Sequence, residues 1–404
     1  MPEFQSVRGF HDLLGEDLRK FRHVSQHLRE KLKLYNFEEV VLPVVEYLEV
    51  FQRSIGEVTD IVQKEMFAFK DQKGRWLALR PEGTAGAVRA YVQNRLYALK
   101  PHVKLFYEGP MFRHERPQAG RYRQFHQIGA EVFGSIDPLV DAEIIQLVYE
   151  FLSELGVPSV IEINSIGCRV CRPAYRVALK EYLEGVSEHL CQVCLDRKDR
   201  NPLRVLDCKV PTCKEAVRGA PKMVDFLCQD CTEHYAKLKE YLQLLSVPYR
   251  ENPYLVRGLD YYTKTVFEAV SPELDMTLVA GGRYDYLVEE LGGPPTPAVG
   301  FAAGLERLSL LVKELPREEP LYMVLPFGDV MDYALAVVKS LRSEGKRVEL
   351  SYKRAGLKKQ LELANRLGVS YVVLVGEEEK AGGFYLLKDM ETGQQVRVEF
   401  NPAL

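Results

Sequence analysis

The sequence has no long apolar segment and no excess of charge of one sign. A run of about 18 apolar residues, which a membrane-spanning helix requires, does not occur. The N-terminus, MPEFQSVRGF, lacks the charged and then apolar pattern of a secretory signal peptide. Lys and Arg number 54 against 57 Asp and Glu, so the formal charge of −3 does not draw the whole chain towards nucleic acid. We therefore expect a cytoplasmic protein whose contacts with any nucleic acid use local basic patches.

The length and composition indicate an ordinary globular protein of two or three domains. The 404 residues are 46% hydrophobic and 27% charged. A charged linker with prolines, KELPREEP at residues 313–320, separates the last part of the chain. The segment of residues 165–250 differs in character from its surroundings, because all eight cysteines lie there. It is the part of the chain that an inserted domain would occupy.

Hydrophobic spacing predicts the elements of the first 160 residues. Apolar residues from Leu18 to Leu32 recur at helical spacing behind Asp17, a suitable N-cap. The other predicted elements are a strand from Phe37 to Val45 interrupted by Pro43, a helix at 46–56, a hairpin of strands 67–70 and 75–79, and a helix that Asp137 and Pro138 open and Gly156 ends.

The most informative stretch runs from Tyr107 to Glu131, YEGPMFRHERPQAGRYRQFHQIGAE. It predicts two strands joined at residues 117–120, which suit a turn. Alternation in the second strand places Phe125, Gln127, Gly129 and Glu131 on one face, and Ile128, Ala130 and Val132 on the other. The second face suits a core. The first, with a ring, an amide, bare backbone and a carboxylate, suits the floor of a ligand site.

Four arginines lie close to this floor. Arg113, Arg116, Arg121 and Arg123 fall within eleven residues, and Arg113 shares a face of the incoming strand with Met111 and Glu115. A planar guanidinium binds phosphate oxygens through two parallel charge-assisted hydrogen bonds, so the cluster suits phosphate. The alternative is a solvated basic hairpin.

A corner between strand and helix, RPEGT, precedes this hairpin. Glu82, Gly83 and Thr84 lie where backbone groups are exposed, and Glu82 could meet a cation. The alternative is that Glu82 and Thr84 only cap the following helix.

The cysteines come in pairs with the spacing of metal ligands. Cys168-x2-Cys171 and Cys191-x2-Cys194 are nineteen residues apart, which fits the four-cysteine zinc template. Cys208-x4-Cys213 and Cys228-x2-Cys231, fourteen residues apart, fit it more loosely. Spacing leaves open a crossed pairing between these knuckles. It also leaves open reduced thiols or disulfides in place of a structural zinc.

The last part of the chain alternates between strands and helices. The predicted elements are a strand at 321–325, a helix at 329–343, a strand at 347–352, a helix at 357–367, a strand at 371–375 and two strands joined at Thr392-Gly393. This is a small α/β unit with a largely parallel sheet. Residues 339–366 hold nine Lys or Arg and three Glu, and Lys353, Arg354, Lys358 and Lys359 follow a strand at the edge where such sheets bind partners.

Three stretches resemble one known family. FRHERPQAGRYRQFHQIGAE resembles motif 2 of class II aminoacyl-tRNA synthetases, in the form found in histidyl-tRNA synthetases. LVRGLDYYTKTVFE, residues 255–268, resembles a histidine-binding segment of that family. GGRYDYLVEELGGPPTPAVGFAAGLERL, residues 281–308, resembles motif 3 and its lead-in. Without this resemblance, the paired tyrosines Tyr261 and Tyr262 would indicate packing, and Arg307 would indicate the solvated face of a helix.

The resemblance implies a fold, a reaction and partners. The fold is an α+β class II synthetase catalytic core, an antiparallel sheet with helices, at 1–164 and 251–315, with a helical, cysteine-rich insertion domain at 165–250 and an α/β anticodon-binding domain at 320–404. The reaction activates L-histidine with ATP and Mg²⁺ and transfers it to tRNA(His). A homodimer is implied by the position of Pro43, which resembles motif 1. The family does not generally carry zinc, so the cysteines depart from its pattern.

The resemblance also implies a role for particular residues. The catalytic residues are Arg113 and Arg257. The histidine-binding residues are Glu82, Gly83, Thr84, Arg113, Gln127, Glu131, Arg257, Tyr261 and Tyr262, and Glu131 and Tyr262 are the partners of the imidazole. The ATP-binding residues are Arg113, Glu115, Arg121, Phe125 and Arg307. The tRNA-binding residues are Arg116, Gln118, Lys353, Arg354, Lys358 and Lys359.

Two other functions compete with this one. A synthetase-like paralogue acts as a non-catalytic, histidine-sensing regulatory subunit of ATP phosphoribosyltransferase. Such proteins tend to lose the motif arginines and the C-terminal domain, whereas Arg113, Arg257 and Arg307 are present here. A nucleic-acid-binding scaffold built around zinc knuckles would explain the cysteines but not the three motifs.

Overall fold

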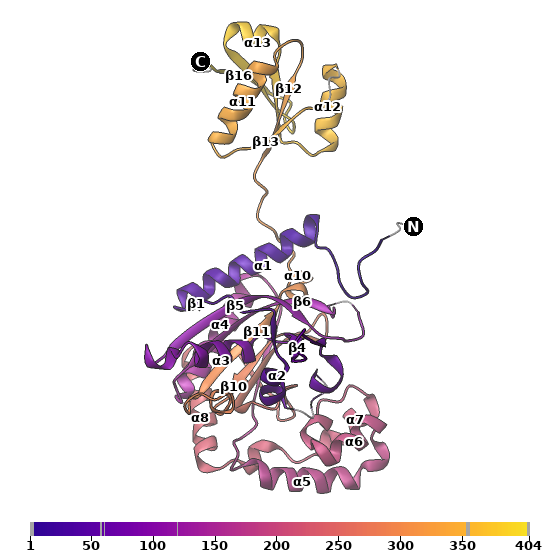
Figure 1. Ribbon diagram of the computed structural model, residues 1–404, viewed down its shortest axis with the longest axis vertical. Coiled ribbons are helices and arrows are strands. Elements are labelled where there is room, and N and C mark those ends of the chain that lie inside the picture. Colours follow the sequence, from indigo (N-terminus) through magenta and orange to yellow (C-terminus); the bar gives the residue numbers. More distant parts are fainter. Residues whose placement is uncertain (1–3, 57–58, 60, 119, 353–355, 402–404) are drawn as a thin grey trace. The chain divides into compact units, whose positions relative to one another are not determined.

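The computed structural model describes residues 4–56, 59, 61–118, 120–352 and 356–401 (Figure 1). The chain divides into two compact units between Leu315 and Pro316. No helix among the described residues is both long and apolar enough to cross a membrane.

An eight-stranded sheet forms the centre of the first unit. In order across the sheet, its strands are β1 (Glu38–Glu39), β5 (Val103–Phe112), β6 (Gln124–Phe133), β11 (Ala298–Gly304), β10 (Met276–Arg283), β9 (Thr263–Ser271), β7 (Val160–Ser165) and β8 (Arg250–Glu251). The outermost pairs, β1 with β5 and β7 with β8, are parallel, and the inner pairs are antiparallel. The predicted hairpin is confirmed as β5 and β6, with Met111 opposite Phe125.

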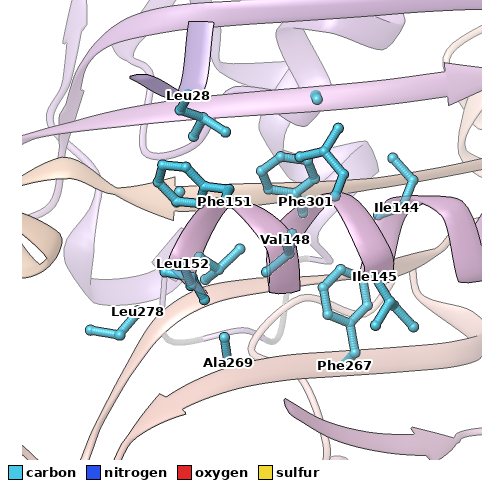
Figure 2. Close-up of a cluster of buried hydrophobic side chains, with 14 of the residues drawn as sticks. Leu28, Ile144, Ile145, Val148, Phe151, Leu152, Phe267, Ala269, Leu278 and Phe301 are labelled. Atoms are coloured by element: carbon cyan, nitrogen blue, oxygen red, sulfur yellow. The ribbon is translucent and has the colours of Figure 1, made fainter. Parts of the chain in front are cut away.

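Helices from distant parts of the sequence cover one face of this sheet. They are α1 (Gly15–Leu34), α4 (Pro138–Glu154), α8 (Gln229–Leu244) and α10 (Leu305–Ser309). Figure 2 shows the core between α4 and the sheet, where Val148 and Phe151 of the helix lie among Leu28, Phe267 and Phe301, all at most 2% exposed. Burying each such side chain stabilises the fold by about 1.5–3 kcal/mol. Ile128, Ala130 and Val132 belong to this core, as their alternation on β6 predicted.

Two boundaries near the N-terminus differ from the prediction. Helix α1 begins at Gly15 and its N-cap is Leu14, so Asp17 lies within the first turn, where its charge favours the helix dipole. The strand predicted from Phe37 to Val45 is reduced to β1. Pro43 has no N–H to offer a strand partner, and the chain resumes as β2 (Val45–Tyr47) before α2 (Leu48–Ile55).

A small second sheet and α3 lie beside the main sheet. In order, the small sheet has β2, β4 (Trp76–Leu79) and β3 (Ala68–Lys70), and the last two confirm the predicted hairpin. Helix α3 (Thr84–Gln93) follows β4, and α9 (Leu287–Glu290) follows β10. The shorter turns are a π-helix at Ile61–Glu65 and 3₁₀-helices at Leu96–Ala98, Ser187–His189, Pro202–Val205, Val217–Gly219 and Met223–Phe226.

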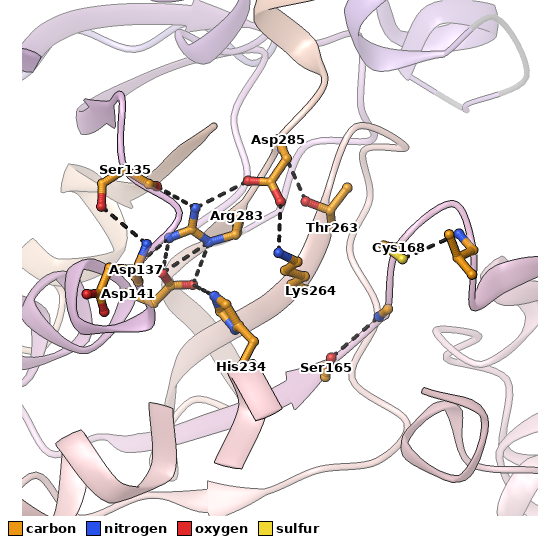
Figure 3. Close-up of polar contacts among 12 residues, drawn as sticks. Ser135, Asp137, Asp141, Ser165, Cys168, His234, Thr263, Lys264, Arg283 and Asp285 are labelled. Atoms are coloured by element: carbon orange, nitrogen blue, oxygen red, sulfur yellow. Dashed lines mark hydrogen bonds and ion pairs between the residues drawn. The ribbon is translucent and has the colours of Figure 1, made fainter. Parts of the chain in front are cut away.

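A buried arginine joins β10 to α4 (Figure 3). Arg283 is fully buried and forms an ion pair with Asp141, which is also fully buried. Its remaining N–H groups donate to the carbonyl oxygens of Ser135 (2.7 Å) and Asp137 (3.3 Å) and to Asp285 (3.2 Å). The guanidinium is therefore matched on every side, as a buried charge requires.

The cysteine-rich segment is helical and returns to the main sheet. It contains α5 (Arg172–Gly185), α6 (Gln192–Arg200) and α7 (Pro211–Ala216), and α8 then packs against α4. Its small core includes cysteine side chains together with Tyr175, Leu179 and Leu183.

The second unit contains a five-stranded sheet with the order β13 (Arg347–Leu350), β12 (Leu321–Pro326), β14 (Tyr371–Val375), β15 (Phe384–Asp389) and β16 (Gln395–Glu399). Its helices are α11 (Met331–Ser343), α12 (Leu357–Arg366) and α13 (Glu377–Gly382). The strands and two of the helices match the prediction closely. The sheet is parallel only among β13, β12 and β14, because β15 and β16 form an antiparallel hairpin at the edge.

Candidate active site

A pocket of about 300 Å³ opens over the middle of the main sheet. Its lining combines β6, β9, β10 and β11 with the loop between β5 and β6 and the segment before β9. The predicted site residues that line it are Glu82, Thr84, Arg113, Glu115, Arg121, Phe125, Gln127, Arg257, Tyr261, Tyr262 and Arg307. Segments from four separate parts of the sequence thus meet at one cavity.

Glu82 lies at the start of α3 and is 4% exposed. Its carboxylate accepts hydrogen bonds from the backbone N–H groups of Thr84 (2.6 Å) and Ala85 (2.9 Å). Glu82 therefore caps the helix, the role that the sequence offered as an alternative for Glu82 and Thr84. Burial raises the pKa of the Glu82 carboxyl, while these two N–H groups act against the shift. The carboxylate still lines the pocket, so capping and ligand binding are compatible here.

Glu131 lies behind the pocket wall and is fully buried. Its Oε1 accepts hydrogen bonds from the hydroxyls of Thr84 (2.8 Å) and Tyr107 (3.0 Å), and its Oε2 accepts one from Tyr284 (2.5 Å). Burial raises the pKa of the Glu131 carboxyl to about 8. A Cβ at Gly300, on the neighbouring strand, would lie 1.8 Å from Oε2, so only glycine leaves room for this carboxylate. Glu131 itself does not line the pocket, and the hydroxyls of Thr84, Tyr107 and Tyr284 occupy its two oxygens.

Gln127 projects from β6 into the same end of the pocket. Its side-chain Oε1 is buried and has no hydrogen-bond partner among the described residues. A buried amide oxygen without a partner is costly in a folded protein, and one in a pocket wall can accept a hydrogen bond from a ligand. Gln127 and Glu82 thus offer acceptors to a cationic group in the pocket.

Arg257 stands at the centre of the lining. It forms an ion pair with Glu268 of β9, whose other oxygen accepts a hydrogen bond from the Thr277 hydroxyl (2.7 Å). Burial is the largest influence on Arg257 and opposes its charge, but Glu268, the Tyr262 and Tyr261 hydroxyls and Asp207 together raise the pKa of the guanidinium. Its carbon Cζ lies 5.9 Å from the centre of the Tyr262 ring. The arginine is therefore permanently charged and held against the tyrosine pair.

Three further arginines, Arg113, Arg121 and Arg307, form a cationic region in the same lining. Arg113 donates to the carbonyl oxygen of Pro81 (2.9 Å), and its Cζ lies 5.4 Å from the centre of the Phe125 ring. Arg307 donates to the carbonyl oxygens of Gly120 (2.9 Å) and Thr277 (2.8 Å). Burial lowers the pKa of Arg307, and the positive charges of Arg121 and Arg113 lower it further. Polyanionic phosphate would relieve this repulsion.

The predicted tRNA-binding residues lie elsewhere. Arg116 and Gln118 are exposed on the loop between β5 and β6, and Lys358 and Lys359 are exposed on α12 of the second unit. Lys353 and Arg354 lie outside the described residues. Gly83, predicted to bind histidine, is the N-cap of α3 and does not line the pocket.

The eight cysteines form two groups of four. One contains Cys168, Cys171, Cys228 and Cys231, and the other contains Cys191, Cys194, Cys208 and Cys213. All eight are free thiols. The pairing is therefore nested, unlike the sequential pairing that spacing suggested first, because the two outer knuckles are brought together where the segment leaves and rejoins the main sheet.

Sequence reasoning missed several residues of the site. Tyr107 and Tyr284 hold Glu131, and Asp207 and Lys209 of the cysteine-rich segment line the pocket. Tyr107 could have been found, since the register of the hairpin places it opposite Gly129, where the missing side chain leaves room for its ring. The signal for Asp207 and Lys209 is absent, because it depends on how the insertion folds back.

Comparison with known proteins adds to this geometry. The family model described as histidyl-tRNA synthetase matches residues 9–308. The chain belongs to the histidyl-tRNA synthetase family. A second model, described as an anticodon binding domain, matches residues 322–404. These residues lie in the second unit, for which the sequence predicted an anticodon-binding domain.

Individual members of the family cover nearly the whole chain. The histidine–tRNA ligase of Aquifex aeolicus is 67% identical over 398 residues, which are 98% of this chain and 99% of that protein. The structure of apo histidyl-tRNA synthetase from S. aureus is 35% identical with a TM-score of 0.81 and covers 98% of this chain and 97% of that one.

A structure described as an ATP phosphoribosyltransferase regulatory subunit/histidyl-tRNA synthetase, from Bacillus halodurans C, is 22% identical with a TM-score of 0.70, covering 93% of this chain and 99% of that one. At that identity it shows a shared fold and no more.

Proposed function

We propose that this chain is a histidine–tRNA ligase that works in two steps. A carboxylate oxygen of histidine attacks the α-phosphorus of ATP, and the bond to the β-phosphate oxygen breaks, which releases pyrophosphate. A hydroxyl of the tRNA terminal ribose then attacks the carbonyl carbon of histidyl-adenylate and displaces AMP. The observation that carries the proposal is a single pocket whose lining combines the buried acceptors of Glu82 and Gln127 with three crowded arginines.

Histidine binds at the acceptors of Glu82 and Gln127. Glu82 and Gln127 bind its α-ammonium group, together with Thr84, and Arg113 lies within reach of its carboxylate. Tyr262, beside Tyr261, and Glu131 are the partners for the two ring nitrogens. Because buried polar groups left unpaired are costly, this arrangement selects imidazole over apolar side chains of similar size.

ATP binds at the arginines of the pocket. Arg113 and Arg257 stabilise charge that develops at the α-phosphate, and Arg307 and Arg121 bind the outer phosphates. The Phe125 ring, under the Arg113 guanidinium, provides a stacking surface for adenine. Reactions of this type need little covalent help from the protein and much positioning, which fixed guanidinium groups supply.

Mg²⁺ fits the chemistry of this lining. It binds commonly through one or two carboxylates plus substrate phosphates, and it neutralises phosphate charge when bound. Glu115 is held only loosely, since its oxygens lie 3.9 Å from Arg113 and 3.7 Å from Arg121. Its carboxylate can therefore serve Mg²⁺ or the adenine amino group. The cysteines stay outside this chemistry, and Zn²⁺ held by them would be structural.

The remaining assignments concern the tRNA and the assembly. Arg116 and Gln118 on the exposed loop between β5 and β6, and Lys358 and Lys359 on α12, contact tRNA(His), with Lys353 and Arg354. The catalytic domain comprises residues 1–164 and 251–315, the insertion 165–250 and the anticodon-binding domain 320–404. A homodimer is supported by apolar side chains near Pro43 that are exposed, such as Val41 (86%) and Tyr47 (47%). The proposed location of the protein is the cytoplasm.

The regulatory-subunit function is less well supported. A histidine sensor needs the acceptors of Glu82 and Gln127 but does not need arginines that repel one another in the absence of phosphate. Here Arg113, Arg257 and Arg307 line one cavity.

Pyrophosphate exchange into ATP tests the proposal, run with each of the twenty amino acids separately. Exchange with histidine alone is the expected result, followed by charging of tRNA(His). Absence of exchange, with histidine binding intact by calorimetry, would refute the ligase assignment in favour of the regulatory one.

A further inference from the structure

The two cysteine groups have the size of mononuclear metal sites. Within each group of four, all sulfur atoms lie within 4.8 Å of one another. The Sγ atoms of Cys168 and Cys171 are 3.6 Å apart, those of Cys168 and Cys228 are 3.9 Å apart, and those of Cys191 and Cys208 are 3.9 Å apart. Zinc with four thiolates at about 2.3 Å gives a tetrahedron whose edges are about 3.8 Å. The sulfurs are thus arranged as four ligands of one ion.

Backbone donors and helix N-termini lie next to sulfur atoms in both groups. Backbone N–H groups point at sulfur, from Cys228 to Cys171 (3.1 Å) and from Cys191 to Cys213 (3.0 Å). Three of the cysteines are N-caps of helices with at least nine residues, where the helix dipole favours negative charge: Cys171 before α5, Cys191 before α6 and Cys228 before α8.

The segment also needs such cross-links. Six of the eight cysteines belong to its small core, and the other two pack against that core. A small core rarely stabilises a domain by itself, and structural metal is a common supplement.

We propose that the chain binds two structural Zn²⁺ ions. The outer site has Cys168, Cys171, Cys228 and Cys231 as ligands, and the inner site has Cys191, Cys194, Cys208 and Cys213. Tetrahedral sites with four thiolates select zinc among the common ions. The outer site closes the insertion at the point where it leaves and rejoins the main sheet, and the inner site lies within it.

The inner site also holds part of the pocket wall, an inference that rests on the proposed function. Its ligand Cys208 lies between Asp207 and Lys209, which line the pocket. Just before them in the chain, Arg204 donates to the carbonyl oxygen of Gly258, and Asn201 donates to the Asp260 carboxylate (3.1 Å). The insertion therefore meets the predicted histidine-binding segment through residues that the inner site fixes in place.

Metal counting on the purified full-length protein tests the two sites and their pairing. We expect two zinc ions per chain by elemental analysis, and cobalt(II) in their place should give the intense thiolate-to-metal absorption of tetrahedral sites. The double variant Cys191→Ala/Cys208→Ala, with both changes in the inner site, should retain one zinc. The double variant Cys171→Ala/Cys191→Ala, with one change in each site, should retain none. If the cysteines instead grouped in sequence order, with Cys168, Cys171, Cys191 and Cys194 in one site, the first variant should retain no zinc and the second should retain one.

Two results would overturn the proposal: a wild-type protein with iron or no metal, or one whose cysteines are disulfides by thiol titration. Circular dichroism of the double variants checks that the main fold survives. If both fail to fold, limited replacement of zinc by cobalt in the wild-type protein still counts the sites.

Exchange kinetics test the link to the pocket. Cys208→Ala should raise the KM for histidine about 10- to 100-fold, the usual consequence of a displaced positioning segment. Val210→Ala, on the same segment but outside the pocket lining, should retain two zinc ions and an unchanged KM. An unchanged KM in Cys208→Ala with one zinc lost would separate the inner site from the pocket. Two zinc ions in a wild-type protein without exchange would refute the proposed function and leave the metal sites standing.

Discussion

Gln127→Met should weaken histidine binding without weakening the fold. Methionine has nearly the same length and shape as glutamine but no hydrogen-bonding oxygen. In the unliganded protein, the buried Oε1 of Gln127 has no partner among the described residues, so the substitution removes an unpaired polar atom and breaks no hydrogen bond of that atom. Such an atom costs about 1–3 kcal/mol, and the variant should therefore be at least as stable as the wild type.

The ligand-bound state should respond in the opposite direction. A hydrogen bond to a charged group such as the α-ammonium contributes about 1.5–3 kcal/mol. At about 1.36 kcal/mol per factor of ten, its loss should raise the KM for histidine about 10- to 150-fold. The KM for ATP should change little, because arginine side chains, and not Gln127, bind its phosphates.

Two measurements on the same sample check this reasoning. Guanidinium denaturation gives the free energy of unfolding, and pyrophosphate exchange at varied histidine gives the KM. Gln146→Met, on α4 where Gln146 donates to Glu150 (2.9 Å), is a matched control and should leave both KM values unchanged. A wild-type KM in Gln127→Met, or a loss of stability of more than about 1 kcal/mol, would show that the side chain has a structural role and would refute the argument.

Three further predictions concern charged groups of the site. Arg257→Ala should reduce adenylate formation by a factor on the order of 10² to 10³, with the fold intact by circular dichroism, because it removes a contact to developing charge. The control is Arg218→Ala, which changes an exposed arginine paired with Glu215. Near-normal activity in Arg257→Ala would exclude the residue from the mechanism. Arg307→Ala should raise the KM for ATP and leave that for histidine unchanged, and a rise in both would place the residue outside the phosphate site. Because burial raises the pKa of Glu131 from 4.5 to about 8, the folded protein holds a proton that the unfolded chain releases, so the free energy of unfolding should fall as the pH rises through that range. Glu131→Gln, measured by denaturation at each pH, should show a shallower fall, and a slope equal to that of the wild type would contradict the shift.

Local features of the sequence predicted much of the fold. The β5–β6 hairpin carries its own information, since alternation assigns the faces of β6 and the residues at 117–120 suit the turn. The cap at Asp137 was predicted correctly because the side chain accepts a hydrogen bond from Leu139, two residues away (2.9 Å). The prediction for Asp17 was wrong, because the helix begins two residues earlier, at Gly15, with Leu14 as an N-cap that offers no side-chain hydrogen bond.

Contacts between distant segments could not be predicted. Tyr284, which holds Glu131, lies 153 residues further along the chain, and no local pattern distinguishes it from a packing tyrosine. The nested grouping of the cysteines depends in the same way on the path of the insertion, which brings Cys168 beside Cys228 although Cys191 is nearer in sequence.

The buried pair of Arg283 and Asp141 restricts how this sequence can vary. Losing one partner leaves the other charged and without water, at a cost of about 3–5 kcal/mol, whereas replacing both with well-packed apolar residues is often neutral. The carbonyl oxygens of Ser135 and Asp137 also accept from the guanidinium, so lysine, whose compact ammonium lacks the planar fork of donors, would leave acceptors unmatched. Evolution can therefore change these two positions together but not one at a time. The constraint is structural, because neither residue lines the pocket.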